Sequence, residues 1–164
     1  MGRVVGGLMT YSTEFHDRIL AEERELVFDA FTRADAWQLG CRMRAAAVER
    51  ELPIVIGIVL GGQRVFHCAL DGAVPDNDSW LERKTRATLH FQRSSMGVGE
   101  QFRVNGRVYE TDSRLPADRY AANGGVFPIR LHGTGVVGAV GVSGLPQVQD
   151  HEFVVAQLRA FRDA

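Results

Sequence analysis

The stretch that decides the fold runs from Tyr120 to His151 and reads YAANGGVFPIRLHGTGVVGAVGVSGLPQVQDH. It contains seven of the eighteen glycines and almost no charge. A segment so poor in large side chains brings its backbone close to another packed element or to a ligand. The pattern predicts two strands, roughly 126–132 and 135–143, then a turn and a final helix from Gln149 to Phe161.

The sequence before this stretch alternates helical and strand patterns. Thr32 is a suitable N-cap for a helix over 33–50, and the aliphatic run from Ile54 to Leu60 predicts a buried strand. Gly61-Gly62 predicts a tight hairpin to a second strand over 65–70. Further expected elements are a helix from Ser12-Thr13 to about Leu20, Glu25–Asp29 as its continuation or as a short strand, a helix over 80–93, a short helix from Ser94 to Phe102 and an irregular segment over 106–120.

This order of elements predicts an α+β fold, with a single antiparallel sheet of about five strands and helices packed on it. The length of 164 residues predicts one domain over 1–164, in which 1–12 is an irregular N-terminal extension. The formal net charge of −1 offers no basic surface for nucleic acid and no polybasic segment for anionic lipid.

Two further features concern location. The N-terminus has no signal-peptide pattern, and no apolar run approaches the ~20 residues that cross a bilayer, so we expect a cytoplasmic protein without a membrane partner. Cys41 and Cys68 have neither disulfide nor zinc spacing, and we expect both thiols to be reduced and buried.

Three polar clusters carry candidate chemistry. The carboxylates of Asp76-Asn77-Asp78 could hold a metal or share a proton, but their position before a helix favours capping. Arg83-Lys84-Thr85-Arg86 places two arginines on one helix face, as a clamp for a carboxylate or phosphate or, alternatively, as a solvated face or a subunit ion pair. Asp150-His151 has the pattern of an oriented general base. Neighbouring helix residues point about 100° apart, however, so we do not expect Asp150 to orient His151 directly. We expect Asp150 to be the N-cap of the last helix and His151 its first helical residue.

Other patterns exclude functions. Ser143 lacks the spacing of a nucleophile elbow, and Gly133-Thr134-Gly135 precedes a strand rather than a helix, which excludes a dinucleotide loop. The histidines have no paired spacing typical of a metal or c-type haem site, so we predict no metal site and assign no catalytic residue. They are His16, His67, His90, His132 and His151.

Three motifs resemble a known family: DNDSWLERK at Asp76–Lys84, SSM at Ser94–Met96, and GGVFPIR with GTGVVGAVGVSGLPQVQDH between Gly124 and His151. They are similar to the GlcG/HbpS-like "haem-degrading domain" superfamily, and more specifically to its uncharacterised branch with a yeast homologue. The similarity covers about Ala21 to Phe161. It implies a profilin-like antiparallel sheet, a symmetric homo-oligomer and haem as a ligand.

The resemblance also extends to single residues. The family often has a histidine just before the glycine pair, where this chain has Asn123, so an iron ligand at that position would be absent. The positions that match the family motif are Arg83, Lys84, Gly124, Gly125, Phe127, Pro128, Gly144 and His151.

Three functions remain open. The first, which we favour, is a homo-oligomer that binds haem or a small anion in a shallow cleft by His151. The second is a haem-degrading oxygenase-type enzyme, with Tyr120, His132 or His151 near the iron. The third is an oligomeric protein-interaction module without catalysis. The predicted ligand-binding residues of the first are Arg83, Lys84, Gly124, Gly125, Phe127 and His151.

Overall fold

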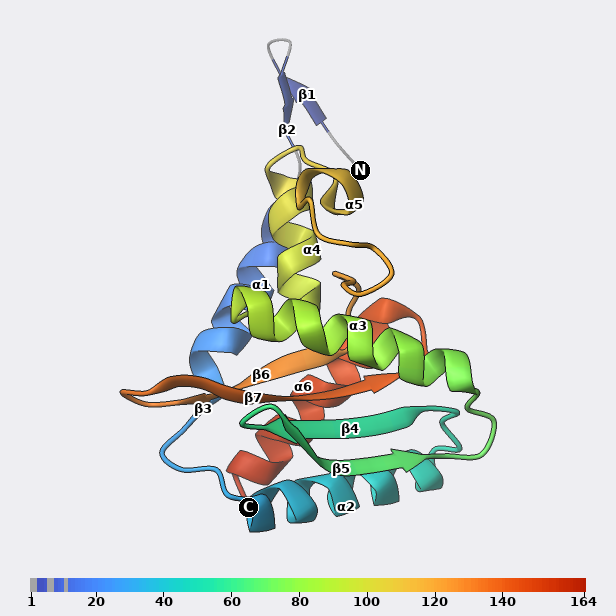
Figure 1. Ribbon diagram of the computed structural model, residues 1–164. Coiled ribbons are helices and arrows are strands. Elements are labelled where there is room, and N and C mark those ends of the chain that lie inside the picture. Colours follow the sequence, from blue (N-terminus) through green and yellow to red (C-terminus); the bar gives the residue numbers. More distant parts are fainter. Residues whose placement is uncertain (1–2, 6–7, 11) are drawn as a thin grey trace.

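A computed structural model describes residues 3–5, 8–10 and 12–164, and its centre is a five-stranded sheet between layers of helices (Figure 1). The strands follow the order β3-β6-β7-β4-β5. Their bounds are Val27–Phe28 for β3, Val55–Leu60 for β4, Gln63–Ala69 for β5, Val126–Leu131 for β6 and Gly135–Ser143 for β7. This confirms the expected α+β sheet with one correction, since β3 pairs with β6 in parallel while the other pairs are antiparallel.

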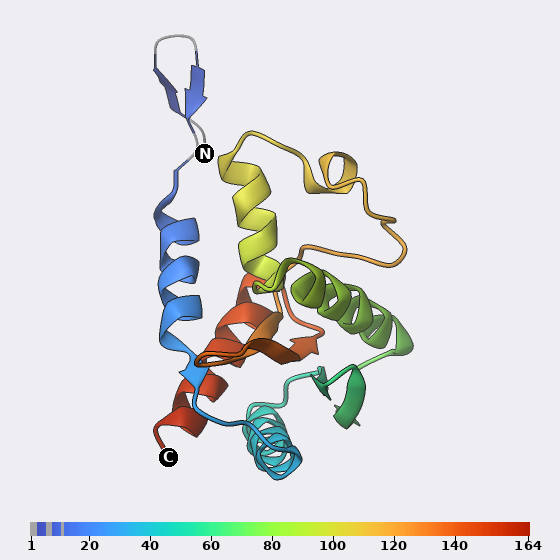
Figure 2. The same cartoon turned by 60° about the vertical axis from the view of Figure 1, so that its left-hand side comes forward.

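The helices lie on both faces of the sheet. Helices α2 and α6 cover one face and α3 covers the other, while α1 and α4 lie side by side near the β3–β6 end of the sheet (Figure 2). Their bounds are Glu14–Glu25 for α1, Arg33–Glu49 for α2, Pro75–Phe91 for α3, Ser95–Val104 for α4, Tyr109–Asp112 for α5 and Gln147–Arg162 for α6. Among the described helices, none is both long enough and apolar enough to cross a bilayer.

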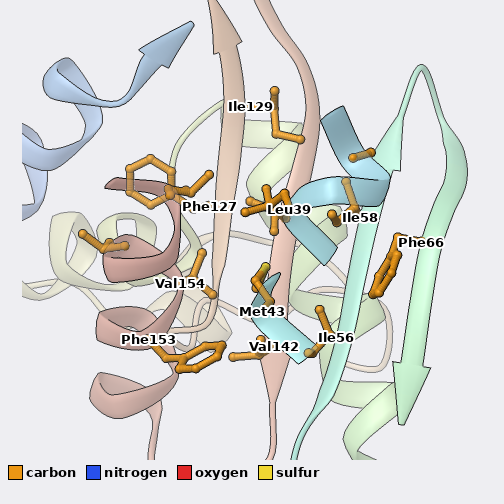
Figure 3. Packing of buried hydrophobic residues seen from close by; sticks show 14 of the residues in the cluster. Leu39, Met43, Ile56, Ile58, Phe66, Phe127, Ile129, Val142, Phe153 and Val154 are labelled. Carbon is orange, nitrogen blue, oxygen red and sulfur yellow. The ribbon is translucent and has the colours of Figure 1, made fainter. Parts of the chain in front are cut away.

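The main core lies between the sheet and the helices α2 and α6 (Figure 3). On β4, Ile56 and Ile58 face this core, whereas Val55 faces Leu81 of α3 on the other side of the sheet. This explains the unbroken aliphatic run of the strand, because both of its faces are covered. Each such side chain contributes roughly 1.5–3 kcal/mol on burial.

Helix α2 is fixed at its start and pressed onto the sheet at its middle. A capping box joins Thr32 and Asp35, in which the Thr32 N–H donates to the Asp35 carboxylate at 2.7 Å and the Asp35 N–H donates to the Thr32 hydroxyl at 3.1 Å. A Cβ atom at Gly40 would overlap the ring of Phe66 on β5. Glycine there permits the close approach of helix and sheet.

Several expected boundaries are corrected by local chemistry. Helix α3 begins at Pro75 rather than Trp80, because proline suits the first helical position and the Asn77 side chain accepts from the Val74 N–H at 2.8 Å. Helix α6 begins at Gln147, so Asp150 is not its N-cap and His151 is not its first residue.

Two segments expected to be irregular contain short elements. Strands β1 (Arg3–Val5) and β2 (Leu8–Thr10) pair antiparallel within 1–12, and α5 lies within 106–120. Both cysteines are free thiols, but Cys41 is exposed and Cys68 is half-buried, which corrects the expectation of buried thiols.

Candidate functional site

A cleft of about 340 Å³ opens where the first turns of α3 and α6 meet the end of β7 and the chain that enters β6. We call it the Lys84 cleft. It is lined by Asp76, Asn77, Trp80, Lys84, Asn123, Gly124, Ser143, Gly144, Leu145, Gln147 and Asp150. Seven of its lining residues belong to the glycine-rich stretch: two come directly before β6, and five come from the segment between the end of β7 and the first turn of α6.

Lys84 forms the floor of this cleft and is only 2% exposed. Its ammonium group donates to the carbonyl oxygens of Gly124 at 3.0 Å and Val142 at 2.8 Å, and it contacts the Asp150 carboxylate at 3.4 Å. An ammonium group has three protons, so these three acceptors engage all of them. The lysine therefore ties α3 to the chain that enters β6, to β7 and to α6 at one point.

Asp150 is the acidic partner, and it is also 2% exposed. Its second oxygen accepts from the Leu145 N–H at 3.1 Å. Burial raises the pKa of Asp150 from 3.8 to about 6, although Lys84 and the N–H groups of Leu145 and Gly144 oppose the rise. Burial also lowers the pKa of Lys84, against the effect of Asp150. The cleft thus contains a carboxyl group whose pKa, at about 6, lies well above its usual range.

The glycine pair makes this arrangement sterically possible. Gly125 has a φ of 136°, and a Cβ atom there would overlap the Lys84 ammonium nitrogen and the Val142 carbonyl oxygen. A Cβ atom at Gly124 would overlap the Gln147 carbonyl oxygen. Both glycines are therefore required for β6 to begin against the lysine and the first turn of α6.

The two arginines of α3 each donate to a backbone carbonyl oxygen. The Arg83 guanidinium lies 4.3 Å from the centre of the Trp80 ring and donates to the Ala117 carbonyl oxygen at 3.0 Å. Arg86 donates to the Arg119 carbonyl oxygen at 3.3 Å. Both side chains hold the segment before β6 against α3, so they have a structural partner.

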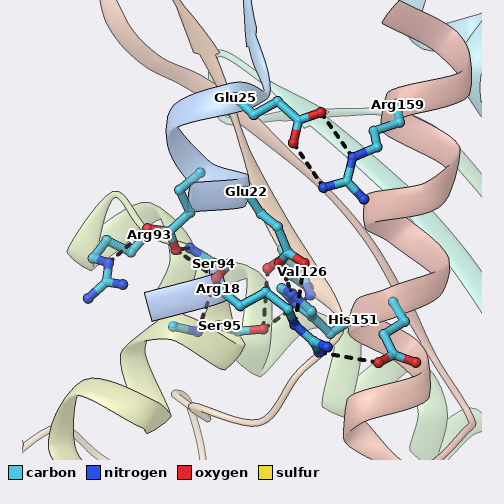
Figure 4. A network of polar contacts seen from close by, with 12 residues as sticks. Arg18, Glu22, Glu25, Arg93, Ser94, Ser95, Val126, His151 and Arg159 are labelled. Atoms are coloured by element: carbon cyan, nitrogen blue, oxygen red, sulfur yellow. Dashed lines mark hydrogen bonds and ion pairs between the residues drawn. The ribbon is translucent and has the colours of Figure 1, made fainter. Parts of the chain in front are cut away.

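His151 and Phe127 lie in the interior instead of the cleft. His151 is 1% exposed, and its Nε2 atom is 2.7 Å from the Glu22 carboxylate on α1 (Figure 4). Its ring lies 6.2 Å from that of Phe127, which is itself buried in the core. The cleft expected beside His151 therefore lies beside its neighbour Asp150.

The three residues of the cluster Asp76-Asn77-Asp78 at the start of α3 have different contacts. Asn77 caps the helix, Asp78 contacts His67 at 2.6 Å, and Asp76 lines the cleft. The favoured capping interpretation is confirmed for Asn77 alone. Ser143, dismissed as a nucleophile, also lines the cleft.

Sequence reasoning missed the Lys84–Asp150 pair as well as Trp80 and Gln147. One signal for the pair was present, because Lys84 lies three residues after Leu81 and four before Thr88, on the buried stripe of its helix. A lysine at a core-facing helical position requires a buried acceptor.

A second cavity of about 310 Å³ adjoins the Lys84 cleft, and Asn123 and Gln147 line both. We call it the Tyr109 cavity. Met96, Phe102 and Tyr109 are among its apolar and aromatic lining residues. Burial raises the pKa of Tyr109.

The chain is similar to proteins of several bacteria and to solved structures. A UPF0303 protein of Streptomyces coelicolor is 51% identical over 140 residues, which cover 85% of this chain and 89% of the relative. One from Edwardsiella ictaluri is 42% identical over 150 residues, covering 92% and 96%. The structure of the yeast Ybr137w protein superposes with a TM-score of 0.82 at 29% identity, covering 90% of this chain and 87% of that one.

More distant structures share the fold. HbpS has a TM-score of 0.62 at 18% identity, covering 96% of each chain, and a structure titled PduOC:heme complex has 0.63 at 20%, covering 80% of this chain and 94% of that one. The family model described as "Haem degrading protein HbpS-like" matches residues 31–159. The chain therefore belongs to the HbpS-like family.

Proposed function

We propose that the protein binds a small polar ligand in the Lys84 cleft. The observation that carries this proposal is the buried Lys84–Asp150 pair at the floor of the cleft. Burial of two charges carries a desolvation penalty that hydrophobic residues of similar volume would avoid. Ionisable groups with displaced pKa values concentrate at functional sites. The volume of about 340 Å³ suits a small molecule.

The lining favours a neutral ligand over an anion. The protons of Lys84 are engaged by protein acceptors, and Arg83 is directed to the segment before β6. The remaining side-chain donors are neutral: the amide N–H₂ groups of Asn77, Asn123 and Gln147, the Ser143 hydroxyl and the Trp80 indole N–H. The Gln147 side-chain oxygen accepts from the Gly124 N–H. These groups suit hydroxyl and carbonyl oxygens of an uncharged molecule.

The description of the family names haem. The residues that line the Lys84 cleft do not suit haem as a ligand. Haem iron takes an axial His, Cys, Met or Tyr, and the described residues that line the Lys84 cleft include none of these types. The Tyr109 cavity offers Met96 and Tyr109, but a raised phenol pKa opposes ligation by Tyr109 as a phenolate. Of the three residues that the sequence suggested near the iron, His151 contacts Glu22, and Tyr120 and His132 line neither the Lys84 cleft nor the Tyr109 cavity.

A titration followed by NMR tests the proposal. In a Trp37→Phe variant, Trp80 is the only indole, so its ¹H–¹⁵N resonance reports on the cleft alone. The probes are three neutral polyhydroxy compounds (glycerol, dihydroxyacetone and glucose), inorganic phosphate, and haem followed by its Soret band. We expect a saturable Trp80 shift with a neutral probe and none with phosphate.

A matched pair of substitutions locates the response. Asn123→Leu removes a cleft amide at nearly constant volume and abolishes the shift. Asn105→Leu makes the same change at an exposed residue outside the cleft and preserves it. A shift with phosphate instead of the neutral probes would favour the small-anion alternative. Equal shifts in both variants would place binding outside the cleft.

A further inference from the structure

Helix α2 has apolar residues on two opposite faces. One face, which includes Leu39 and Met43, packs in the core. The opposite face is exposed and consists of Ala34, Trp37, Cys41, Ala45 and Val48. Trp37 is 63% and Val48 49% exposed, which is unusual for such large apolar side chains. A helix that is apolar on both sides is normally covered on both.

The outer face has room for a partner. In Figure 1, α2 runs along the lower edge of the molecule, and no other described element lies beneath it. At about 100° per residue, the five residues fall within an arc of about 80°. They form one continuous stripe, which we call the outer stripe of α2.

The outer stripe has the same spacing when read from either end. Its intervals are 3, 4, 4 and 3 residues, which are symmetric about Cys41. A second copy of α2 in antiparallel orientation therefore sets Cys41 against its own equivalent. It also sets the bulky Trp37 beside the small Ala45, and Val48 beside Ala34. Large side chains then lie next to small ones, as a two-fold interface requires.

A cavity beside the stripe is placed where it can accept Trp37 of a second copy. Within its own chain, Trp37 packs edge-on against Phe66 of β5, with 5.7 Å between the ring centres. The cavity has a volume of about 400 Å³ and lies between the end of α2 and the end of β5. Arg44 and Val48 line it, and they share one side of the helix with Trp37, within an arc of about 40°. In the antiparallel pair, Trp37 of each copy faces the mouth of this cavity on the other copy. A central aromatic residue in a pocket is the usual energetic centre of an interface.

Charges support the same orientation. The cavity carries Glu51 and Asp71 on its rim, whereas Arg33 lies at the first turn of α2. Antiparallel pairing brings Arg33 of one copy to the acidic rim of the other, and symmetry forms this contact twice. A parallel arrangement would place like charges together.

We propose that the outer stripe of α2 is a two-fold interface between two copies of this chain, centred on Cys41, with Trp37 inserted beside Val48 of the other copy.

Cross-linking tests the centre of the interface. In a Cys68→Ser background, mild oxidation is expected to give a covalent dimer through Cys41, because a two-fold axis near this residue brings the two Cα atoms within the roughly 7 Å that a disulfide allows. Cys41→Ser in the same background gives no dimer.

Substitutions test its energy. Trp37→Glu and Val48→Glu are each expected to weaken self-association about 30-fold or more, measured by analytical ultracentrifugation and native mass spectrometry. Val108→Glu is the matched control, because Val108 is exposed to a similar extent, at 56%, and directly precedes α5, which lies at the opposite end of the molecule from α2 (Figure 1). Circular dichroism verifies that each variant is folded. If a variant is unfolded, the Cys41 cross-linking experiment tests the interface in its place. A monomeric protein at all concentrations, or an assembly that neither substitution weakens and that Cys41 does not cross-link, would overturn the proposal.

Discussion

Asp150 and His151 are consecutive residues of α6, and both are nearly inaccessible to solvent. Each forms an acid–base pair with a side chain of another helix. Asp150 pairs with Lys84 of α3 and lines a cleft, whereas His151 pairs with Glu22 of α1 within the protein interior. The comparison teaches that burial and pairing alone do not identify a site. Both residues of the first pair line the same cleft, whereas in the second pair only Glu22 reaches a surface pocket and His151 lines none of the cavities of the described residues.

The largest expected effect comes from breaking the cleft pair. Lys84→Met leaves the Asp150 carboxylate buried without its cation, and we expect a loss of about 3 to 5 kcal/mol in the free energy of unfolding, measured with urea. Adding Asp150→Asn removes the unpaired charge and restores at least half of the loss. If the double variant is no more stable than the single one, the pair is not the source of the effect.

The pH dependence is the next largest effect. The pKa of Asp150 rises from 3.8 to about 6 on folding, so the folded state binds more protons than the unfolded state between these values. The contribution of Asp150 to the free energy of unfolding then falls as pH rises from about 4 to about 6 and keeps its lower value above that range. A shift of about two units corresponds to at most about 3 kcal/mol.

Two variants assign this slope. Asp150→Asn is expected to flatten the decline over that range, while His151→Gln retains it, measured by urea unfolding at a series of pH values. An unchanged profile in Asp150→Asn would show that other groups cause the decline.

A smaller effect is expected from the glycine that admits the lysine. Gly125→Ala combines a strained backbone angle with overlap of Lys84 and the Val142 carbonyl. Gly133→Ala also has a positive φ, of 74°, but its Cβ atom meets nothing within 4 Å. We expect Gly125→Ala to be less stable than Gly133→Ala by about 2 kcal/mol in thermal or urea unfolding. Equal losses of stability in the two variants would mean that backbone strain alone, and not overlap with Lys84, requires glycine at position 125.

The smallest effect is expected at the interior pair. In His151→Gln the amide can still donate to Glu22, so we expect a loss of about 1 kcal/mol in the free energy of unfolding. Ligand affinity in the Lys84 cleft stays within about twofold of the unchanged protein, because His151 does not line the cleft. A large loss of affinity without unfolding would return His151 to the binding site.

The sheet was predictable because its signals are local. The Gly61-Gly62 hairpin has positive φ values at both glycines, and the β6–β7 pair follows directly from its pattern of small and β-branched residues. Strand β3 was harder, since two residues carry little periodicity and its parallel pairing with β6 joins distant parts of the chain.

The site was only partly predictable. Lys84, Gly124 and Gly125 were expected together, and the structure brings them together at one point. Their acidic partner was missed because contact between α3 and α6 spans 66 residues of sequence, which no local spacing encodes. The hydrogen bond from Arg83 to the Ala117 carbonyl oxygen could not be predicted either, because sequence gives no clue to a backbone partner.

The most direct test of the account is the Trp80 indole resonance of the Trp37→Phe variant, followed during titration with the neutral polyhydroxy probes and, separately, with haem. The account predicts a saturable Trp80 shift with a neutral probe that Asn123→Leu abolishes and His151→Gln preserves, and no Soret shift at stoichiometric haem. A stoichiometric Soret shift together with an unmoved Trp80 resonance for every neutral probe would contradict it.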